Sequence, residues 1–220
     1  MNKDQTKKII QKKKIGTNYV FFVKKNISKN NTYSGHAIYQ EISKKYLLCK
    51  KAFNLNEKSS IFFDLNSKKK LVKPEWIASR SALLILVDYF LSIKDLKGTL
   101  SLSISHTKYN AVVAGVINDD IDGIGVDIED CSRRITNNVI KRISNPSEIN
   151  ISNNHQVWNI KEAVFKNCSF KNQKSIADVS IKKKIRESLF IATHENEEFL
   201  VKVFKFENVY FAISTKQAFN

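Results

Sequence analysis

Short runs of β-branched and aromatic residues, separated by turn-forming residues, recur along most of this chain. Runs of this kind favour strands, because branched and aromatic side chains pack well on a pleated surface. They predict strands at residues 19–25, 59–65, 100–105, 110–117, 123–130, 188–194, 198–206 and 209–214. The chain is therefore expected to be rich in β structure.

Three segments show helical rather than alternating patterns, at residues 37–48, 74–93 and 156–168. The second begins with Pro74, and proline suits the first turn of a helix because its fixed φ is already helical. Trp76, Leu83 and Val87 then give this helix a broad apolar face. The third helix has a narrower apolar stripe, formed by Val157, Ile160, Val164 and Cys168.

The order of these elements suggests two similar halves. Each half has a strand, a helix opening with a tryptophan (Trp76 or Trp158), and then a pair of strands. An acidic, turn-rich break, NDDID, separates them at 118–122. We therefore expect an α+β fold with two α/β halves related by pseudo-two-fold symmetry, and the strand at 123–130 at their junction. The expected ranges are 1–17 for a basic, frayed arm, 18–121 for the first half and 122–215 for the second.

The charge balance is strongly basic, with 37 Lys and Arg against 21 Asp and Glu and a formal net charge of +16. Such a field favours polyanionic partners, among them nucleic acids, acidic proteins and multiply phosphorylated small molecules. Much of the excess is Lys beside Asn, which a bias spread over solvated faces also explains. Charge alone does not choose among these partners.

Targeting and redox signals point to a cytoplasmic protein. The first residues contain no apolar segment of signal-peptide length, and the apolar run at 82–87 is too short to span a bilayer. The three cysteines, Cys49, Cys131 and Cys168, form no C-x-x-C pair. A disulfide framework and a zinc knuckle are therefore not expected.

The stretch GIGVDIED at 123–130 is the first candidate for chemistry. On a strand, side chains two positions apart leave from the same face, so Asp127 and Glu129 would lie together. Two carboxylates this close repel each other unless a cation lies between them, and Mg²⁺ commonly uses such ligands. An edge strand with a solvated acidic face is the alternative.

Other candidate residues have ordinary readings when each is taken alone. Glu162 and Lys166 are four residues apart on the third helix, as in many solvated surface pairs. His106 follows a strand and would serve as a turn or core histidine, and Arg80 would be a solvated helix charge.

Read together, three segments of the chain resemble the phosphopantetheinyl transferases, of the single-chain, pseudo-dimeric type that activates peptide and polyketide synthases. They are SISHT at 103–107, GVDIE at 125–129 and WNIKEAVFK at 158–166, in the family's order. PEWIASR at 74–80 is similar to the helix that opens the family's first half. KRISNPSE at 141–148 is similar to the segment between its second and third motifs.

The resemblance implies a role for each matching residue. The Mg²⁺ ligands would be Asp127, Glu129 and Glu162. The coenzyme A nucleotide would be bound by Arg80, Ser105, His106 and Thr107. Lys166 would contact the diphosphate or the attacking hydroxyl, and Glu148 would be a helper base beside Glu162.

The implied enzyme is a holo-[acyl-carrier-protein] synthase that acts as a monomer. It would transfer 4′-phosphopantetheine from coenzyme A to a serine hydroxyl of an apo acyl or peptidyl carrier protein, releasing 3′,5′-ADP. Breaking the phosphoanhydride requires neutralisation of charge on its oxygens, which Mg²⁺ and a lysine supply. The acidic carrier and anionic cofactor suit the basic chain. Neither a nucleic acid nor a membrane is an expected partner.

Two alternatives remain open from the residues alone. A nucleic-acid-binding protein would display aromatic residues interleaved with Lys, which FLVKVFKF at 199–206 offers, although a core strand has the same alternation. A metal-dependent nuclease would need two acids and a lysine. Such sites usually have the order E-x-K, whereas Lys161 here precedes Glu162.

Overall fold

A computed structural model describes residues 10–15, 18–27, 35–55, 73–168 and 175–217 of the chain. The described residues form two compact units, whose principal boundary lies between Asp119 and Asp120. Each unit holds one five-stranded sheet and its helices, and each is described by itself. The predicted strand at 59–65 lies outside the described residues.

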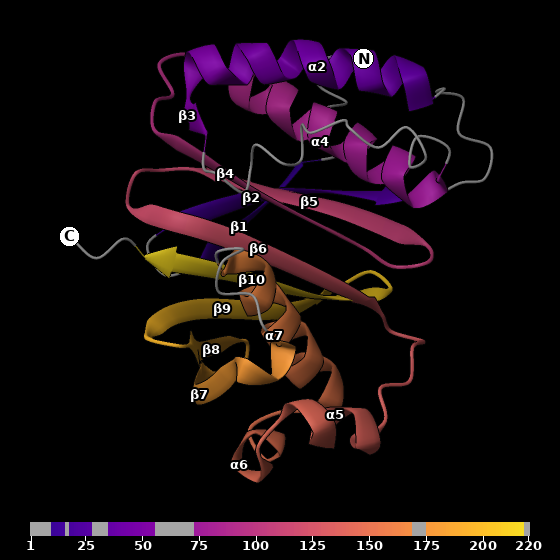
Figure 1. Ribbon diagram of the computed structural model, residues 1–220, viewed down its shortest axis with the longest axis vertical. Helices are drawn as coiled ribbons and strands as arrows, with labels where there is room; N and C mark the ends of the chain where they lie inside the picture. The colour runs from indigo at the N-terminus through magenta and orange to yellow at the C-terminus, as the bar shows by residue number, and fades with distance from the viewer. Residues whose placement is uncertain (1–9, 16–17, 28–34, 56–72, 169–174, 218–220) are drawn as a thin grey trace. The chain divides into compact units, whose positions relative to one another are not determined.

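Unit 1 is a mixed sheet with two helices. Its strands, in the order β1-β2-β5-β4-β3, are β1 (Ile10–Ile15), β2 (Asn18–Asn26), β5 (Asn110–Ile117), β4 (Thr99–His106) and β3 (Asn54–Leu55). The β2–β5 and β4–β5 pairs are antiparallel, and β3 pairs with β4 in parallel. Helix α4 (Pro74–Ser92) packs on this sheet, and helix α2 (Gly35–Ala52) packs on α4 (Figure 1).

Helix α4 begins and ends where its sequence signals predict. Lys73 is extended and precedes Pro74, which occupies the first helical positions, and the chain becomes extended again at Ile93. Leu83, Leu86 and Phe90 are fully or almost fully buried and belong to the core of unit 1. The predicted helix from Pro74 onwards is confirmed.

Unit 2 is an antiparallel sheet crossed by one long helix. Its strands, in the order β6-β10-β9-β8-β7, are β6 (Ile121–Asp130), β10 (Val209–Gln217), β9 (Glu197–Phe206), β8 (Leu189–His194) and β7 (Ser180–Arg186). Its helices are α5 (Asn137–Ile143), α6 (Pro146–Ile149), α7 (Asn154–Asn167) and the 3-10 turn η2 (Ile176–Asp178).

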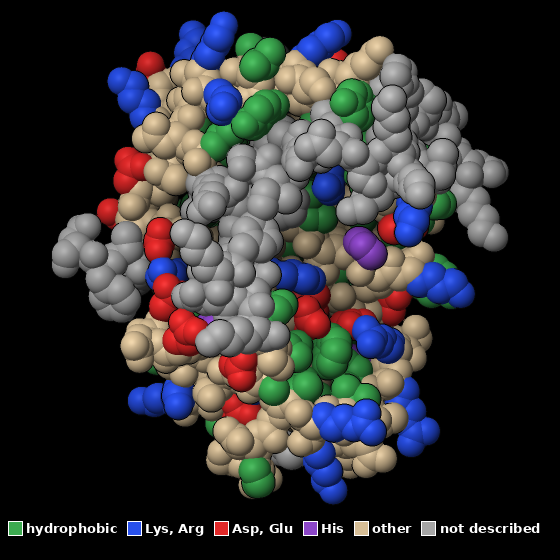
Figure 2. All heavy atoms as spheres, viewed as in Figure 1, with side chains coloured by type: hydrophobic (Ala, Val, Ile, Leu, Met, Phe, Trp, Pro, Cys, Tyr) green, Lys and Arg blue, Asp and Glu red, His purple; other side chains and the backbone are tan. Residues whose placement is uncertain are grey.

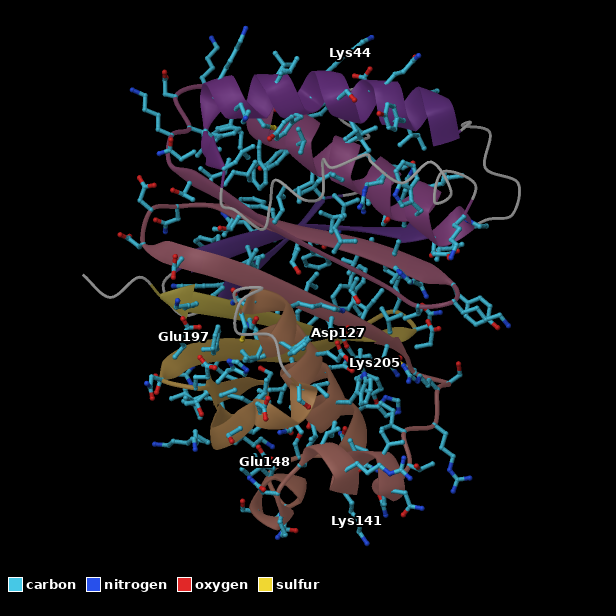
Figure 3. The ribbon with its side chains drawn as sticks, viewed as in Figure 1. Lys44, Asp127, Lys141, Glu148, Glu197 and Lys205 are labelled. Carbon is cyan, nitrogen blue, oxygen red and sulfur yellow. The ribbon has the colours of Figure 1, made fainter. Side chains whose placement is uncertain are left out.

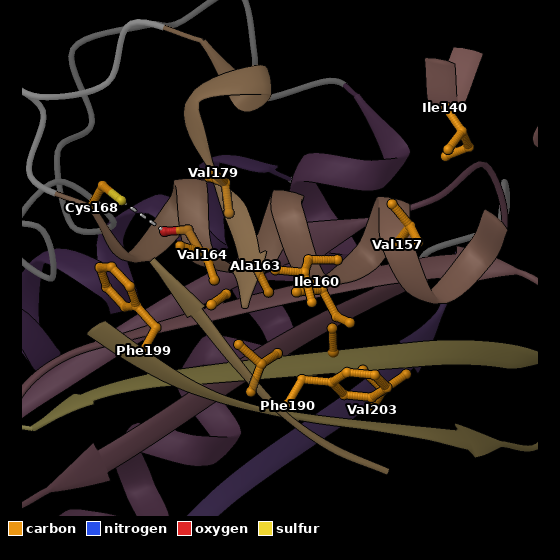
Figure 4. Packing of buried hydrophobic residues seen from close by; sticks show 14 of the residues in the cluster. Ile140, Val157, Ile160, Ala163, Val164, Cys168, Val179, Phe190, Phe199 and Val203 are labelled. Atoms are coloured by element: carbon orange, nitrogen blue, oxygen red, sulfur yellow. Dashed lines mark hydrogen bonds between the residues drawn. The ribbon is translucent and has the colours of Figure 1, made fainter. Parts of the chain in front are cut away.

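Helix α7 supplies the helical half of the unit 2 core. Its Ile160, Ala163 and Val164 face Phe190 and Val203 of the sheet (Figure 4). All these side chains are almost completely removed from water. The stripe predicted on this helix, including Val157 and Cys168, is the stripe that the structure buries.

Two glycines of β6 let α7 lie unusually close to the sheet. A Cβ at Gly125 would collide with the backbone oxygen of Ala163, and one at Gly123 would collide with the side-chain oxygen of Asn167. Neither glycine has a positive φ, so close approach rather than backbone conformation requires them. Ser214 of β10 completes the contact by donating a hydrogen bond to the Ala163 oxygen at 2.8 Å.

The fold agrees in part with the expectations from sequence. The protein has two five-stranded sheets with helices, which is compatible with the α+β class. The pseudo-two-fold relation, the division at 121/122 and the junction site stay predictions. Residues 10–15 form strand β1, so the expectation of a frayed arm is wrong there. No described helix is both long and apolar enough to cross a membrane.

Gly125→Ala is expected to destabilise the protein by about 1–3 kcal/mol, because the added methyl group meets backbone, which cannot rotate away. Gly123→Ala is the matched control, since its obstacle is the end of a side chain. Urea unfolding of both variants measures the difference. Equal losses of stability in the two variants would contradict the proposed role of the backbone contact.

Candidate functional site

Strand β6 places Asp127 and Glu129 on the same face as Gly125, the face that α7 covers. Their side chains are therefore removed from water, with only 4% and 5% of the residue exposed. The predicted same-face arrangement is confirmed. The alternative of a solvated acidic face is wrong, because the helix lies over these two residues.

Two cationic side chains accompany the carboxylates. Lys166 of α7 places its Nζ 2.6 Å from Asp127 Oδ1, and the Arg133 guanidinium contacts Glu129 Oε1. Arg133 also lies over the ring of Trp158, 5.3 Å from its centroid. Figure 3 shows Asp127 where α7 crosses the sheet of unit 2. The helix thus carries both a charge partner and an aromatic neighbour for the strand.

Glu162 joins this group electrostatically. Burial raises the pKa of Glu162, Lys166 lowers it, and the charges of Asp127 and Glu129 raise it further. Burial likewise raises the pKa of Glu129. The hydrogen bond from Arg133 lowers this pKa, and the charge of Asp127 raises it. The three carboxylates are therefore close enough to repel one another. We call Asp127, Glu129, Glu162, Lys166 and Arg133 the acidic cluster.

The donor chemistry of the acidic cluster suits Mg²⁺, which prefers oxygen ligands and commonly takes one or two carboxylates beside water and phosphate. In the structure, however, Lys166 and Arg133 contact two of the three carboxylates. Over the described ranges, no three His, Cys, Asp or Glu side chains are grouped closely enough to hold a metal ion. A metal ion here would have to replace those cationic contacts.

Glu148, the predicted helper base, belongs to a buried structural ion pair. Its carboxylate lies 3.1 Å from Lys161 Nζ and accepts hydrogen bonds from the backbone N–H groups of Asn145 and Ile181, at 2.7 and 2.6 Å. Lys161 and Glu148 are 1% and 2% exposed. Figure 3 shows Glu148 well apart from Asp127.

The nucleotide-binding residues suggested by sequence lie in unit 1. Ser105 and His106 end strand β4, and Thr107 follows them; Ser105 is buried and His106 is exposed. The Thr107 hydroxyl accepts hydrogen bonds from the N–H groups of Tyr109 and Asn110, so it also stabilises the turn into β5.

Arg80 is not the solvated helix charge that its pattern alone allows. It lies on α4, is partly buried, and its guanidinium is 5.6 Å from the ring centroid of Trp76. Burial lowers the pKa of Arg80 to about 10. Its Nη1 donates a 3.4 Å hydrogen bond to Ser79 Oγ. A cation held partly out of water in this way is suited to pairing with an anion.

Strand β9 explains the alternation that suggested nucleic-acid binding. Phe199, Val201 and Val203 are buried in the unit 2 core beneath α7. On the opposite face, Phe204 stacks on Phe211 with 5.1 Å between ring centroids. The aromatic side chains of this strand therefore contact protein, and the alternation reflects packing rather than a display of rings for bases.

Sequence reasoning missed three residues that shape the site: Lys161, Arg133 and Trp158. Nothing in the sequence around Lys161 signals burial, yet this lysine is fully buried. Arg133 lies four residues after Glu129, a spacing that could have identified it as a charge partner. Trp158 belongs to the motif at 158–166, and its side chain forms a hydrogen bond with Glu129, which the motif does not indicate.

Comparison with known proteins assigns no family to this chain. No protein-family model matches it, and no curated protein matches it significantly.

Lys161→Met is expected to destabilise the protein by about 3–5 kcal/mol, because Glu148 would be left as a buried charge without its cation. Adding Glu148→Gln should recover a large part of this loss, since the remaining side chain is neutral. Urea unfolding of the two single variants and the double variant measures the coupling. Purely additive losses would show that the buried pair does not act as a unit.

Glu162→Gln is expected to make the protein more stable than the wild type at neutral pH. Because the folded pKa of Glu162 is raised above its ordinary 4.5, the folded wild type loses stability as pH rises from 4.5 through the folded pKa. The free energies of unfolding of the wild type and the variant should therefore become equal at acidic pH. Urea unfolding across pH tests this, with the exposed Glu198→Gln as the control for net charge. A pH-independent difference would contradict the assigned cause.

Proposed function

We propose that this protein transfers 4′-phosphopantetheine from coenzyme A to a serine hydroxyl of an apo carrier protein, with Mg²⁺ as cofactor and 3′,5′-ADP as product. The observation that carries the proposal is the acidic cluster. Its carboxylates come from two of the motifs that resemble the transferases, and Lys166 of the second motif lies 2.6 Å from Asp127 of the first. Side chains distant in the sequence thus form one charged group.

The charge of the cluster supports a role with phosphates. Three carboxylates are accompanied by two cations, Lys166 and Arg133, so the negative charge is not fully balanced. Burial, and after it the neighbouring carboxylates, raise the pKa of Glu129 and of Glu162. Asp127, Glu129 and Glu162 would hold Mg²⁺. When bound, Mg²⁺ would supply charge neutralisation to the phosphoanhydride oxygens. This role requires Lys166 and Arg133 to leave the carboxylates that they contact.

Lys166 would then act on the substrate. Its side chain is partly exposed and ends in a compact ammonium group, which can follow charge that develops on a phosphate oxygen. Moving from Asp127 to the diphosphate would exchange one anionic partner for another. The proposal therefore assigns Lys166 a direct contact with the group that is transferred.

The serine hydroxyl of the carrier needs a proton acceptor, and the geometry favours Glu162 over Glu148. Glu148 already accepts hydrogen bonds from two backbone N–H groups and from buried Lys161. Burial raises the pKa of Glu162, with a further rise from Asp127 and Glu129 that opposes Lys166, and a raised pKa strengthens a carboxylate as a base. Glu148 would serve as a positioning residue for α7, through Lys161.

The nucleotide is assigned to unit 1. Arg80 and the exposed His106 would bind the 3′-phosphate of coenzyme A, with Ser105 and Thr107 beside it at the end of β4. The pseudo-two-fold relation between the halves, and a single substrate contacting both sets of residues, belong to this proposal. The partner would be an acidic carrier protein, to which the net charge of +16 is complementary.

Asp127→Asn and Glu162→Gln should each lower transfer by about 10²-fold or more, because each removes charge from the proposed metal site. The assay follows the gain of phosphopantetheine mass on several apo acyl and peptidyl carriers incubated with coenzyme A and Mg²⁺. Glu198→Gln is the control for an exposed carboxylate.

His106→Ala should mainly raise the KM for coenzyme A.

Two results would count against the proposal. If no carrier gains the mass with the wild-type protein, the transferase activity is rejected. If transfer is seen and Asp127→Asn retains it, the activity stands but Asp127 is removed from the metal site.

A further inference from the structure

Helix α2 carries two leucines, Leu47 and Leu48, on the side that faces away from the core of unit 1. Leu47 and Leu48 are 61% and 47% exposed, and they stand between the exposed Lys44 and Lys51. The four positions have the spacing i, i+3, i+4, i+7, so they share one face of the helix. Figure 3 shows Lys44 projecting away from unit 1. We call these four residues the α2 face.

The α2 face is not needed for packing within unit 1. The opposite side of α2 already supplies Ile38, Ile42 and Cys49 to the core, each at most 3% exposed. That side packs on α4, and a 2.6 Å ion pair between Lys45 and Asp88 fastens the two helices at the border. The exposed leucines therefore lie on a helix whose position is set by other residues.

The chemistry of the α2 face is apolar in the centre and basic at both ends. Lys50 adds a further positive charge, and it lies over the ring of Tyr46 at 5.0 Å from the centroid. The acidic residue of the helix, Glu41, is partly exposed and lies 3.9 Å from Lys45. Figure 2 shows hydrophobic and Lys or Arg side chains intermixed along the part of unit 1 where Figure 1 places α2.

We propose that the α2 face binds an acidic amphipathic helix of a partner protein. Leu47 and Leu48 would pack against the apolar stripe of that helix, and Lys44 and Lys51 would pair with acidic residues flanking the stripe. Helices bind in this way through anchors at i, i+3, i+4 and i+7, and the flanking charges set orientation and encounter rate.

The charge of the α2 face favours an acidic helix over two alternatives, a second copy of this chain and a membrane surface. Two copies of the α2 face would bring Lys44 and Lys51 against the same lysines, which disfavours a symmetric dimer. A membrane surface binds helices with a broad apolar face, whereas this one has two leucines between lysines and Gln40 beside them. An acidic helix satisfies both the apolar centre and the basic ends.

The inference does not depend on the proposed transferase activity. It uses residues of α2 alone, none of which belongs to the acidic cluster or to the nucleotide-binding set. Loss of binding at α2 and loss of transfer are therefore separate observations.

The test uses the full chain and a fluorescein-labelled, designed helical peptide of about 18 residues, with leucines on one stripe and glutamates on both sides. Fluorescence anisotropy should show binding that Lys44→Glu with Lys51→Glu weakens by about tenfold or more, and that Leu47→Ala with Leu48→Ala also weakens. The matched controls are Lys182→Glu with Lys184→Glu, and Ile185→Ala, at exposed positions of β7. These should leave binding almost unchanged.

Several results would overturn the proposal. One is an equal loss of peptide binding in the α2 and β7 charge variants, which would indicate only the general basic field. Another is equal binding of a peptide with the same composition in scrambled order. A third is an effect of the α2 variants on binding to phosphatidylserine vesicles, or on self-association in sedimentation, without an effect on the peptide. Circular dichroism verifies that the variants keep their fold.

Discussion

The close approach of α7 to β6 is the constraint on which the candidate site depends. A side chain larger than hydrogen at Gly125 would meet the backbone of α7 at Ala163. Because the helix lies this close, Lys166 reaches Asp127 and Glu162 comes within range of both strand carboxylates. The same approach removes Asp127 and Glu129 from water, so that charges which would be screened on a surface act strongly on each other.

Helix α7 carries different charge pairs on different sides. Towards β6, Lys166 and Glu162 belong to a group in which burial and like charge raise the pKa of two carboxyls. Elsewhere on the helix, buried Lys161 pairs with Glu148 and donates hydrogen bonds to the Glu148 carboxylate and to the Val179 carbonyl. The Lys161–Glu148 pair has its charges balanced within the protein, which suits a structural role. The acidic cluster has three carboxylates and only two cations, which suits the binding of a charged ligand.

Much of the fold follows from patterns that can be read in the chain. The β-branched runs and the 3.6-residue stripe of α7 reflect burial on one face, which is what periodicity reports, and Asp127 and Glu129 share a face because strand geometry requires it. Strand β7 could not be predicted from periodicity, since most of its residues are charged and exposed. The burial of Lys161 could not be predicted either, because lysine is nearly always solvated unless a distant partner compensates it. Glu148, thirteen residues earlier, is that partner.

The most direct test of this account is the binding of a divalent cation by the acidic cluster. Mn²⁺ can substitute for Mg²⁺, and electron paramagnetic resonance measures the free ion in solution. The account predicts that the wild-type protein removes free Mn²⁺ signal at one ion per chain, that Asp127→Asn greatly weakens this binding, and that Glu198→Gln does not. Equal free Mn²⁺ with wild type and Asp127→Asn would contradict it.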